Sequence, residues 1–398
     1  MVDVAVTTSA DSSLHTLQQR SGPMYTNKDI GYAFFMAGSG RLSYKKTTDG
    51  GATWDFLRTA LTSSNGSHMD VYCEKWTPDD LGNLIHAVWI NTANDDVEYR
   101  SLDTSDDSLS PTVVVFDGAT FGLGRSATNC SIAKAVGGNL YIQFWGDEDG
   151  ERGFLRSVDG GTTWTSRTDG ADGNESDEIL LFPDPDSADS QDVCMIYWDR
   201  SADEITLKKY DNSANSWSET LISASMVDDE SILQMSAVLR LSDKHIILAA
   251  WSDVDVTTAD LKIFDIAVGT TTVVTKTDVV TNADDCVCAA LFIDQNTDDL
   301  YCAYLGNEDG SQTFKTSLTA FFKKSTDDGA TWGSQTTYQE DTADDERYID
   351  AGSSTPDMAE GRFQPGFFND DLNDFFVNKG NSVEISAVAA ARRVIVVS

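Results

Sequence analysis

Carboxylates are the side chains of this 398-residue sequence most able to do chemistry, because they are numerous and locally clustered. Asp and Glu number 65 against 28 Lys and Arg, for a net charge of −37. One cluster, Asp184, Asp186 and Asp189 with the neighbouring Asp192, offers the oxygen ligands that Ca²⁺ prefers, although its spacing is not that of an EF-hand loop. Two interpretations stay open, a calcium site or a solvated acidic loop, and no other cofactor is indicated.

The acidic charge also limits the partners of the chain. A negative field repels phosphate backbones, so we expect no nucleic-acid partner. The carboxylates are spread along the whole sequence, which suits either adaptation to a saline habitat or the holding of divalent cations. There is no apolar stretch of about 20 residues and no basic segment leading into an apolar one at the N-terminus. We therefore expect no membrane insertion and see no signal peptide.

Short apolar runs recur through the chain and must form the elements that position any site. Most of them end in Phe or Trp, and the first six end 53 to 56 residues apart. The seven runs are 32–35, 87–89, 143–145, 195–198, 249–251, 303–305 and 375–377. A fixed period of about 40 to 55 residues built from short strands is typical of β-propellers. We predict an all-β propeller of four-stranded antiparallel blades, with seven blades fitting better than six.

The predicted propeller is a single domain over residues 1–398, because a ring of equal blades is one cooperative body. Its seventh unit follows an insertion at about 339–360. The strands predicted for that unit are Arg362–Phe368, Asp374–Asn378, Val383–Val388 and Arg393–Val397. An open ring would expose two sheet edges, so we expect the terminal segments to close it. Either 2–6 or 394–397 is available as the outer strand of the last blade.

Three predicted turns share the pattern Ser/Thr-x-Asp-x-Gly-x-Thr-Trp. The Asp can accept backbone hydrogen bonds within its own turn, the Gly permits a positive φ, and the Trp buries a large surface. The residues concerned are Asp49, Gly51 and Trp54, then Asp159, Gly161 and Trp164, then Asp327, Gly329 and Trp332. The pattern resembles the Asp-box, or BNR, repeat of sialidases and related propellers. This resemblance covers most of the chain and implies that the boxes lie on the outer rim, away from a central site.

A sialidase-like site would need an arginine triad for a substrate carboxylate, a Tyr nucleophile activated by Glu, and an Asp acid/base. By position, the resemblance implies Arg20, Asp70, Tyr348 and Arg362 as the catalytic candidates. The family's early aromatic-Arg-Ile-Pro motif should precede the first box, yet the matching segment 19–23 reads Gln-Arg-Ser-Gly-Pro. The broken motif argues against glycosidase activity, although repeat type alone does not decide function.

We therefore expect a non-enzymatic structural or interaction propeller, such as a tail or capsid-surface component of a virion from a saline habitat. Such a protein would be located in the virion, or in the cytoplasm before assembly. The alternatives are a sialidase-like exoglycosidase and a carbohydrate-binding propeller without turnover. Partners under these hypotheses are other protein subunits of an assembly or a cell-surface glycan.

Overall fold

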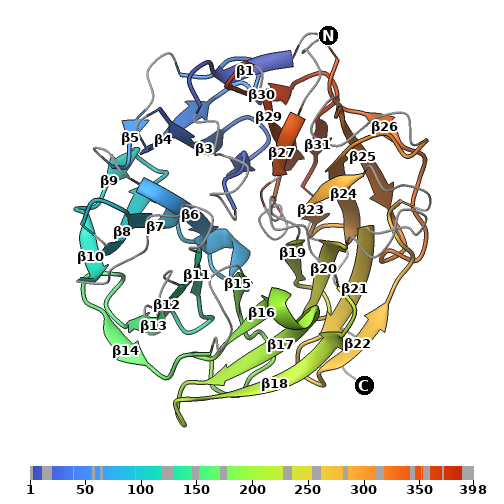
Figure 1. The fold of residues 1–398 in the computed structure, drawn as a ribbon. Coiled ribbons are helices and arrows are strands. Elements are labelled where there is room, and N and C mark those ends of the chain that lie inside the picture. The colour runs from blue at the N-terminus through green and yellow to red at the C-terminus, as the bar shows by residue number, and fades with distance from the viewer. Residues whose placement is uncertain are drawn as a thin grey trace.

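A computed structural model shows seven β-sheets arranged around a common axis (Figure 1). Each is an antiparallel blade of four main strands, which confirms the predicted seven-bladed β-propeller. Among the described residues no helix has the length and apolar content needed to cross a membrane. The described residues are 3–10, 20–38, 40–55, 59–62, 66–94, 96–117, 129–145, 152–170, 177–226, 235–252, 261–280, 286–309, 318–340, 346–350, 352, 359–369 and 372–387.

The first three blades follow the chain in order, from the strand nearest the axis to the strand at the rim (Figure 1). Blade 1 contains β2 (Met24–Tyr25), β3 (Gly31–Ala37), β4 (Arg41–Thr47) and β5 (Thr59–Ala60). Blade 2 contains β6 (Gly66–Cys73), β7 (Leu84–Asn91), β8 (Asp96–Asp103) and β10 (Val113–Phe116), with the short β9 (Ser108–Leu109) also paired to β8. Blade 3 contains β11 (Asn129–Lys134), β12 (Leu140–Trp145), β13 (Arg152–Ser157) and β14 (Thr165–Arg167).

Blades 4 to 6 repeat this order. Blade 4 contains β15 (Glu178–Pro183), β16 (Val193–Asp199), β17 (Glu204–Asp211) and β18 (Ser216–Ser223). Blade 5 contains β19 (Met235–Arg240), β20 (His245–Trp251), β21 (Leu261–Ala267) and β22 (Thr272–Thr275). Blade 6 contains β23 (Val287–Asp294), β24 (Asp299–Leu305), β25 (Ala320–Ser325) and β26 (Thr336–Thr337). Short 3₁₀ turns follow β6 and β16, at Glu74–Trp76 and Arg200–Ala202.

Blade 7 joins the two ends of the chain. Its strands, from the axis outward, are β27 (Glu346–Asp350), β29 (Gly366–Asn369), β30 (Asp374–Asn378) and β1 (Asp3–Thr7). In the outer pair, Val4 lies opposite Val377 and Ala5 opposite Phe376. The N-terminal strand thus supplies the rim of the last blade, and the edge of β30 is covered.

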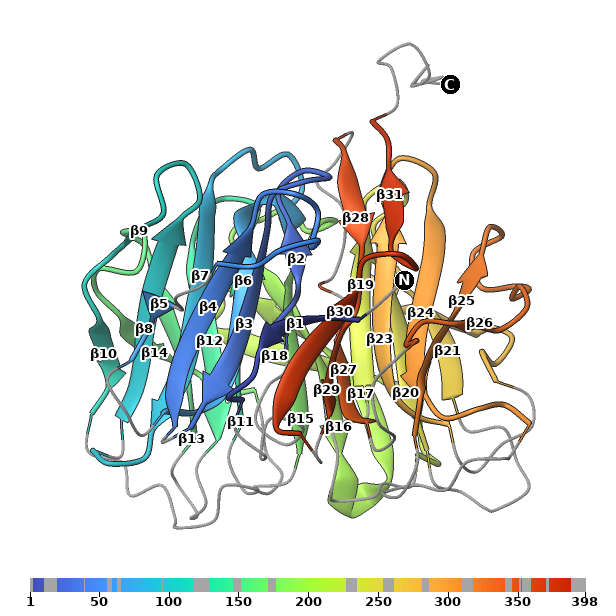
Figure 2. The same cartoon turned by 90° about the horizontal axis from the view of Figure 1, so that it is seen from above.

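The strands predicted for the seventh unit are partly wrong. The inner strand β27 comes from residues that were expected to belong to the insertion. The predicted strand 362–368 is divided into β28 (Gly361–Phe363) and β29, because Pro365 has no backbone N–H for a sheet ladder. β31 (Val383–Ile385) pairs with β28 in a separate two-stranded sheet (Figure 2). Residues 393–397 lie outside the described part of the chain.

The periodic apolar runs occupy the second strand of each of the first six blades. These strands are covered on both faces by neighbouring strands and blades, so they are continuously apolar instead of alternating. Trp89, Trp145 and Trp198, which end three of the runs, are 0%, 2% and 0% exposed. The seventh run, 375–377, is an exception, since it lies in β30, the third strand of its blade.

The three Asp-Gly-Thr-Trp turns adopt one hydrogen-bonded conformation between the third and fourth strands of blades 1, 3 and 6. In the turn of blade 3, Asp159 Oδ1 accepts from Thr163 N (2.8 Å) and from the Ser157 hydroxyl (2.8 Å), while Oδ2 accepts from the Thr163 hydroxyl (2.6 Å). Asp49 and Asp327 make the same three bonds. The φ angles of Gly51, Gly161 and Gly329 are 83°, 90° and 78°, in the region that favours glycine.

The Asp159 turn should stabilise the fold in a pH-dependent way. Hydrogen bonds from Thr163 and Ser157 lower the pKa of Asp159 from an ordinary value of 3.8 to about 2. A carboxylate with a depressed folded-state pKa stabilises the protein above its unfolded pKa, and this contribution is lost as the pH falls through the folded value. We expect Asp159→Ala to lower the free energy of unfolding at pH 7 and to have progressively less effect between pH 4 and pH 2. Urea unfolding at these pH values measures the difference, and a difference independent of pH would contradict the assignment.

Candidate functional site

Arg20 and Asp70, two of the catalytic candidates, meet in a buried ion pair among the inner strands. They are 5% and 0% exposed. Arg20 Nε donates to Asp70 Oδ1 (2.8 Å), and Nη2 donates to Asp70 Oδ2. Arg20 also donates to the carbonyls of Ile132 in β11 (2.6 Å) and Leu181 in β15 (3.3 Å). The guanidinium of Arg20 therefore donates hydrogen bonds to residues of three successive blades, 2, 3 and 4.

Asp70 and the residues after Arg20 extend this network. Asp70 Oδ2 accepts from Ile132 N (2.9 Å) and the Ser131 hydroxyl (2.9 Å). On the other side, Asp350 Oδ2 in β27 accepts from Ser21 N (2.5 Å) and Gly22 N (2.8 Å). The segment 20–22 thus connects the inner strands of blades 2, 3, 4 and 7.

The other two catalytic candidates do not join this pair among the described contacts. Arg362 lies in β28 and donates to Lys28 O (2.8 Å) and to the Ser382 hydroxyl (2.9 Å), with Glu384 Oε2 at 3.4 Å. Tyr348 lies in β27, where its backbone is opposite Phe368. The sequence candidates are therefore placed on several elements; the side chain of Tyr348 lies outside the described part, and of the other three Arg20 and Asp70 meet while Arg362 lies apart.

The acidic loop between β15 and β16 uses its carboxylates on the protein itself. Asp184 faces Lys209 Nζ at 3.0 Å, and Asp186 faces Lys244 Nζ at 3.0 Å. Asp189 Oδ1 accepts from Gln191 N at 3.0 Å. Within the described part of the chain no group of three or more His, Cys, Asp or Glu side chains is placed to hold a metal ion. Calcium binding at this loop stays an untested prediction.

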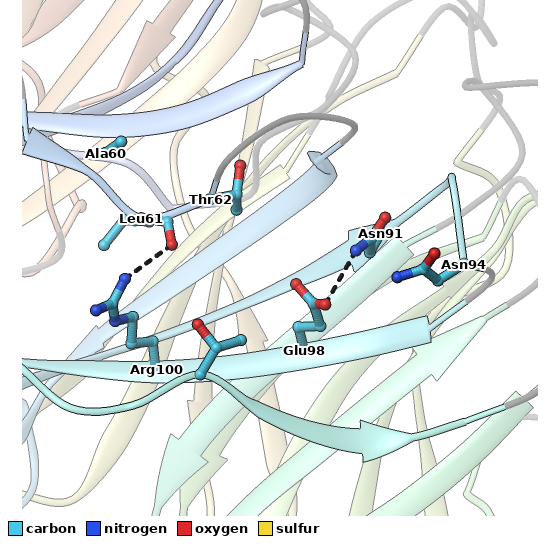
Figure 3. A pocket seen from close by; sticks show the side chains of 8 residues that line it. Ala60, Leu61, Thr62, Asn91, Asn94, Glu98 and Arg100 are labelled. Carbon is cyan, nitrogen blue, oxygen red and sulfur yellow. Dashed lines mark hydrogen bonds between the residues drawn. The ribbon is translucent and has the colours of Figure 1, made fainter.

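A pocket of about 530 Å³ lies between blades 1 and 2 (Figure 3). One wall is Ala60 of β5 with the following Leu61 and Thr62, and the other comes from blade 2, from the end of β7, the turn after it, β8 and the residue before β10. Volumes of this size are typical of small-ligand sites. The blade 2 wall consists of Asn91, Asn94, Glu98, Arg100 and Thr112. Every one of these five side chains is polar.

Strand alternation explains why Glu98 and Arg100 share the pocket. Residues two apart in a strand point to the same face, so both side chains of β8 lie toward blade 1. Tyr99, between them, points to the opposite face and packs against Trp164 of blade 3 with 5.3 Å between ring centroids. Tyr99 is 1% exposed, which anchors the strand that presents the two charged groups.

The carboxylate of Glu98 is held in place by its neighbours. Oε2 accepts from Trp89 Nε1 (2.8 Å) and Oε1 from Asn91 Nδ2 (2.9 Å). Each carboxylate oxygen keeps a further acceptor site for a ligand hydroxyl. Asn91 is fixed in turn, because its Oδ1 accepts from Ala93 N (3.1 Å). Asn94 and Thr112 are exposed and add an amide and a hydroxyl that can donate and accept.

Arg100 supplies the donor side of the pocket. Its Nε donates to Ser110 O (2.5 Å) and its Nη1 to Leu61 O (3.1 Å), so it bridges blades 1 and 2. Figure 3 shows its guanidinium reaching toward Leu61, at the opposite end of the pocket from Asn94. Burial lowers the pKa of the guanidinium, which stays far above neutrality as arginine does in proteins. The pocket therefore presents a fixed carboxylate acceptor and a fixed cationic donor on one face of a strand.

Sequence reasoning missed this pocket. The stretch Asp96–Asp103 resembles any half-exposed strand with alternating polar side chains, and it contains no catalytic or binding motif. The second wall comes from another blade and becomes adjacent only on folding. The polar character of one face of β8 was the available signal, but it is also what a solvated strand shows.

No protein-family model matches the chain, and no curated protein matches it. Among solved structures it is similar to a polysaccharide lyase described as an ulvan lyase, with a TM-score of 0.55 at 11% identity over 97% of this chain and 96% of the lyase. A second ulvan lyase structure gives a TM-score of 0.53, also at 11% identity and with the same coverage, 97% and 96%. The Aleuria aurantia lectin has a TM-score of 0.44 at 12% identity, covering 77% of this chain and 92% of the lectin. The two likenesses to the lyase concern the fold of the chain.

Proposed function

We propose that this propeller binds carbohydrate in the pocket between blades 1 and 2. The observation that carries the proposal is the polar wall of blade 2, where Glu98 and Arg100 are held by hydrogen bonds from and to the protein. Sugars present many hydroxyls that both donate and accept, and preorganised acceptors and donors side by side match that chemistry. The ulvan lyase that shares the fold is described as bound to a saccharide, which supports the same class of ligand.

The geometry at the axis favours binding over a sialidase-like reaction. A substrate carboxylate needs a free guanidinium fork, but both N–H groups of Arg20 Nη2 are engaged by Asp70 and Ile132 O. Asp70 accepts four hydrogen bonds in the same network, which fits a structural anion better than an acid/base. The virion role and the saline habitat rest on the sequence alone and stay predictions.

We also propose that the three matching turns are Asp-box repeats. Their support is the common set of bonds from one carboxylate to the Thr four residues later and to the Ser or Thr two residues earlier. The bonds close each turn on itself. Such a role is structural, so it is compatible with a binding function elsewhere on the ring.

Glu98→Gln is expected to weaken glycan binding at least tenfold, because a ligand hydroxyl loses a charged acceptor worth roughly 1.5–3 kcal/mol. Binding is measured on an array of neutral and acidic oligosaccharides, followed by calorimetry with the strongest ligand. Glu219→Gln is the matched control, since Glu219 lies on β18 at the rim of blade 4, far from the pocket in the fold. Absence of binding to every sugar on the array would refute the proposed function.

A further inference from the structure

Among the described residues Arg100 has no carboxylate partner, in a protein that has carboxylates in excess. Within the described part of the chain, five arginines form ion pairs with carboxylates, namely Arg20, Arg152, Arg200, Arg240 and Arg362, whereas Arg156 and Arg167 donate to neutral acceptors outside the pocket. Arg100 has no carboxylate among its described contacts, and its two protein acceptors are the neutral carbonyls of Ser110 and Leu61. A partly buried charge is costly unless it is paired. We therefore expect its counter-ion to be a ligand and not one of the described protein groups.

The N–H groups of Arg100 that no described residue occupies can bind such a counter-ion. Nε is occupied by Ser110 O, and Nη1 uses one of its two N–H groups on Leu61 O. No described residue accepts from the second N–H of Nη1 or from either N–H of Nη2, and these groups lie on the terminal edge of the guanidinium. This edge is a planar fork that matches the two oxygens of a carboxylate or a sulfate.

The same pocket also contains side chains that can bind the hydroxyls of a sugar. Glu98 and Arg100 are two residues apart on β8, about 6.7 Å along the strand. A negative group bound by Arg100 is thereby kept at a distance from the Glu98 carboxylate, while Glu98 and Asn94 face the rest of the pocket (Figure 3). One acidic sugar can bind Arg100 through its negative group and Glu98 or Asn94 through its hydroxyls.

We infer that the ligand is an acidic sugar whose carboxylate or sulfate ester is bound by the terminal guanidinium edge of Arg100. This assignment rests on the proposed carbohydrate binding and names the substrate class of that site. The negative group supplies the charge partner that no described residue gives to Arg100. A neutral sugar can occupy the same hydroxyl-binding groups, but it leaves the fork unused.

Matched ligands test the assignment on the unmodified protein. Methyl glycosides of glucuronate, galacturonate and mannuronate are each compared by saturation-transfer NMR and calorimetry with the parent hexoside and with the uronate methyl ester. We expect at least one uronate to bind tenfold or more tightly than both of its neutral partners, the gain of a charged hydrogen-bonded pair. Glucose 6-sulfate against glucose reports the sulfate alternative, and a tenfold gain there supports the assignment equally.

Substitutions then locate the effect. Arg100→Met should remove the preference for the acidic ligand, and Arg100→Lys should retain part of it as a point charge without the fork. Arg167→Met is the matched control, because Arg167 donates to Tyr210 and to Asn212 O, outside the pocket, and its loss changes the net charge equally. Thermal unfolding of each variant shows whether it is folded.

The outcomes separate the two proposals. Equal binding of acidic and neutral partners to the native protein overturns the Arg100 assignment and leaves carbohydrate binding intact. A preference that survives in folded Arg100→Met overturns it as well. Failure of all these sugars and of the array ligands to bind refutes the proposed function itself.

Discussion

Replacing Asp70 with Asn is expected to lower the free energy of unfolding by about 3–5 kcal/mol. The carboxylate is fully buried and accepts from Arg20, Ser131 and Ile132 N. Its neutral substitute leaves the Arg20 guanidinium buried without a counter-charge and turns one acceptor into a donor. Urea unfolding followed by tryptophan fluorescence measures the loss.

Two further variants decide whether that loss belongs to the buried pair. Asp186→Asn removes a carboxylate whose ion pair with Lys244 is about half exposed, so it should cost less than about 1 kcal/mol. The double variant Arg20→Met with Asp70→Leu should recover much of the stability, because a buried apolar pair carries no uncompensated charge. A single Asp70→Asn variant as stable as Asp186→Asn would show that the pair does not hold the inner strands.

Removal of residues 1–9 should destabilise the ring by about 4 kcal/mol or more. The deletion exposes the edge of β30, breaks the pairing of Val4, Ala5 and Thr7, and removes the fully buried Val6 side chain. Burial of one such side chain contributes about 1.5–3 kcal/mol, and each net hydrogen bond about 0.5–1.5 kcal/mol. An unpaired edge should also promote self-association, which light scattering detects.

A synthetic peptide of residues 1–9 tests whether the effect is specific. Added in trans, it should restore the thermal midpoint of the shortened protein by strand addition to β30. The same peptide with Val4→Pro should not do so, because proline removes the backbone donor and distorts the strand. Unchanged stability after deletion would mean that β1 is dispensable for closure.

The blade number could be predicted because one physical requirement repeats. Each second strand is packed on both faces, so each must be apolar, and the run ends such as Trp145 and Trp198 mark the period. Blade 7 departs from this pattern because its strands come from distant segments of the chain. Its apolar run at 375–377 serves the third strand, and Pro365 separates β28 from β29.

The binding pocket could not be predicted for a different reason. Glu98 and Arg100 lie on an ordinary alternating strand, and their significance depends on Leu61 and Thr62 of the neighbouring blade. Conversely, Arg20 and Asp70 were catalytic candidates because of their residue types and their positions in the repeat, yet they form an ion pair with each other in the structure. Residue type and position in a repeat do not reveal whether a charge is already neutralised within the protein.

The contact that closes the ring joins two segments that are synthesised far apart in time. Asp3 and Asn378 are hydrogen-bonded partners although they are 375 positions apart. At translation rates of about 5–20 residues per second, the first strand emerges roughly 20 to 75 s before its partner is made. Throughout that interval β1 has no partner strand, so the ring can close only after residues 374–378 have been made.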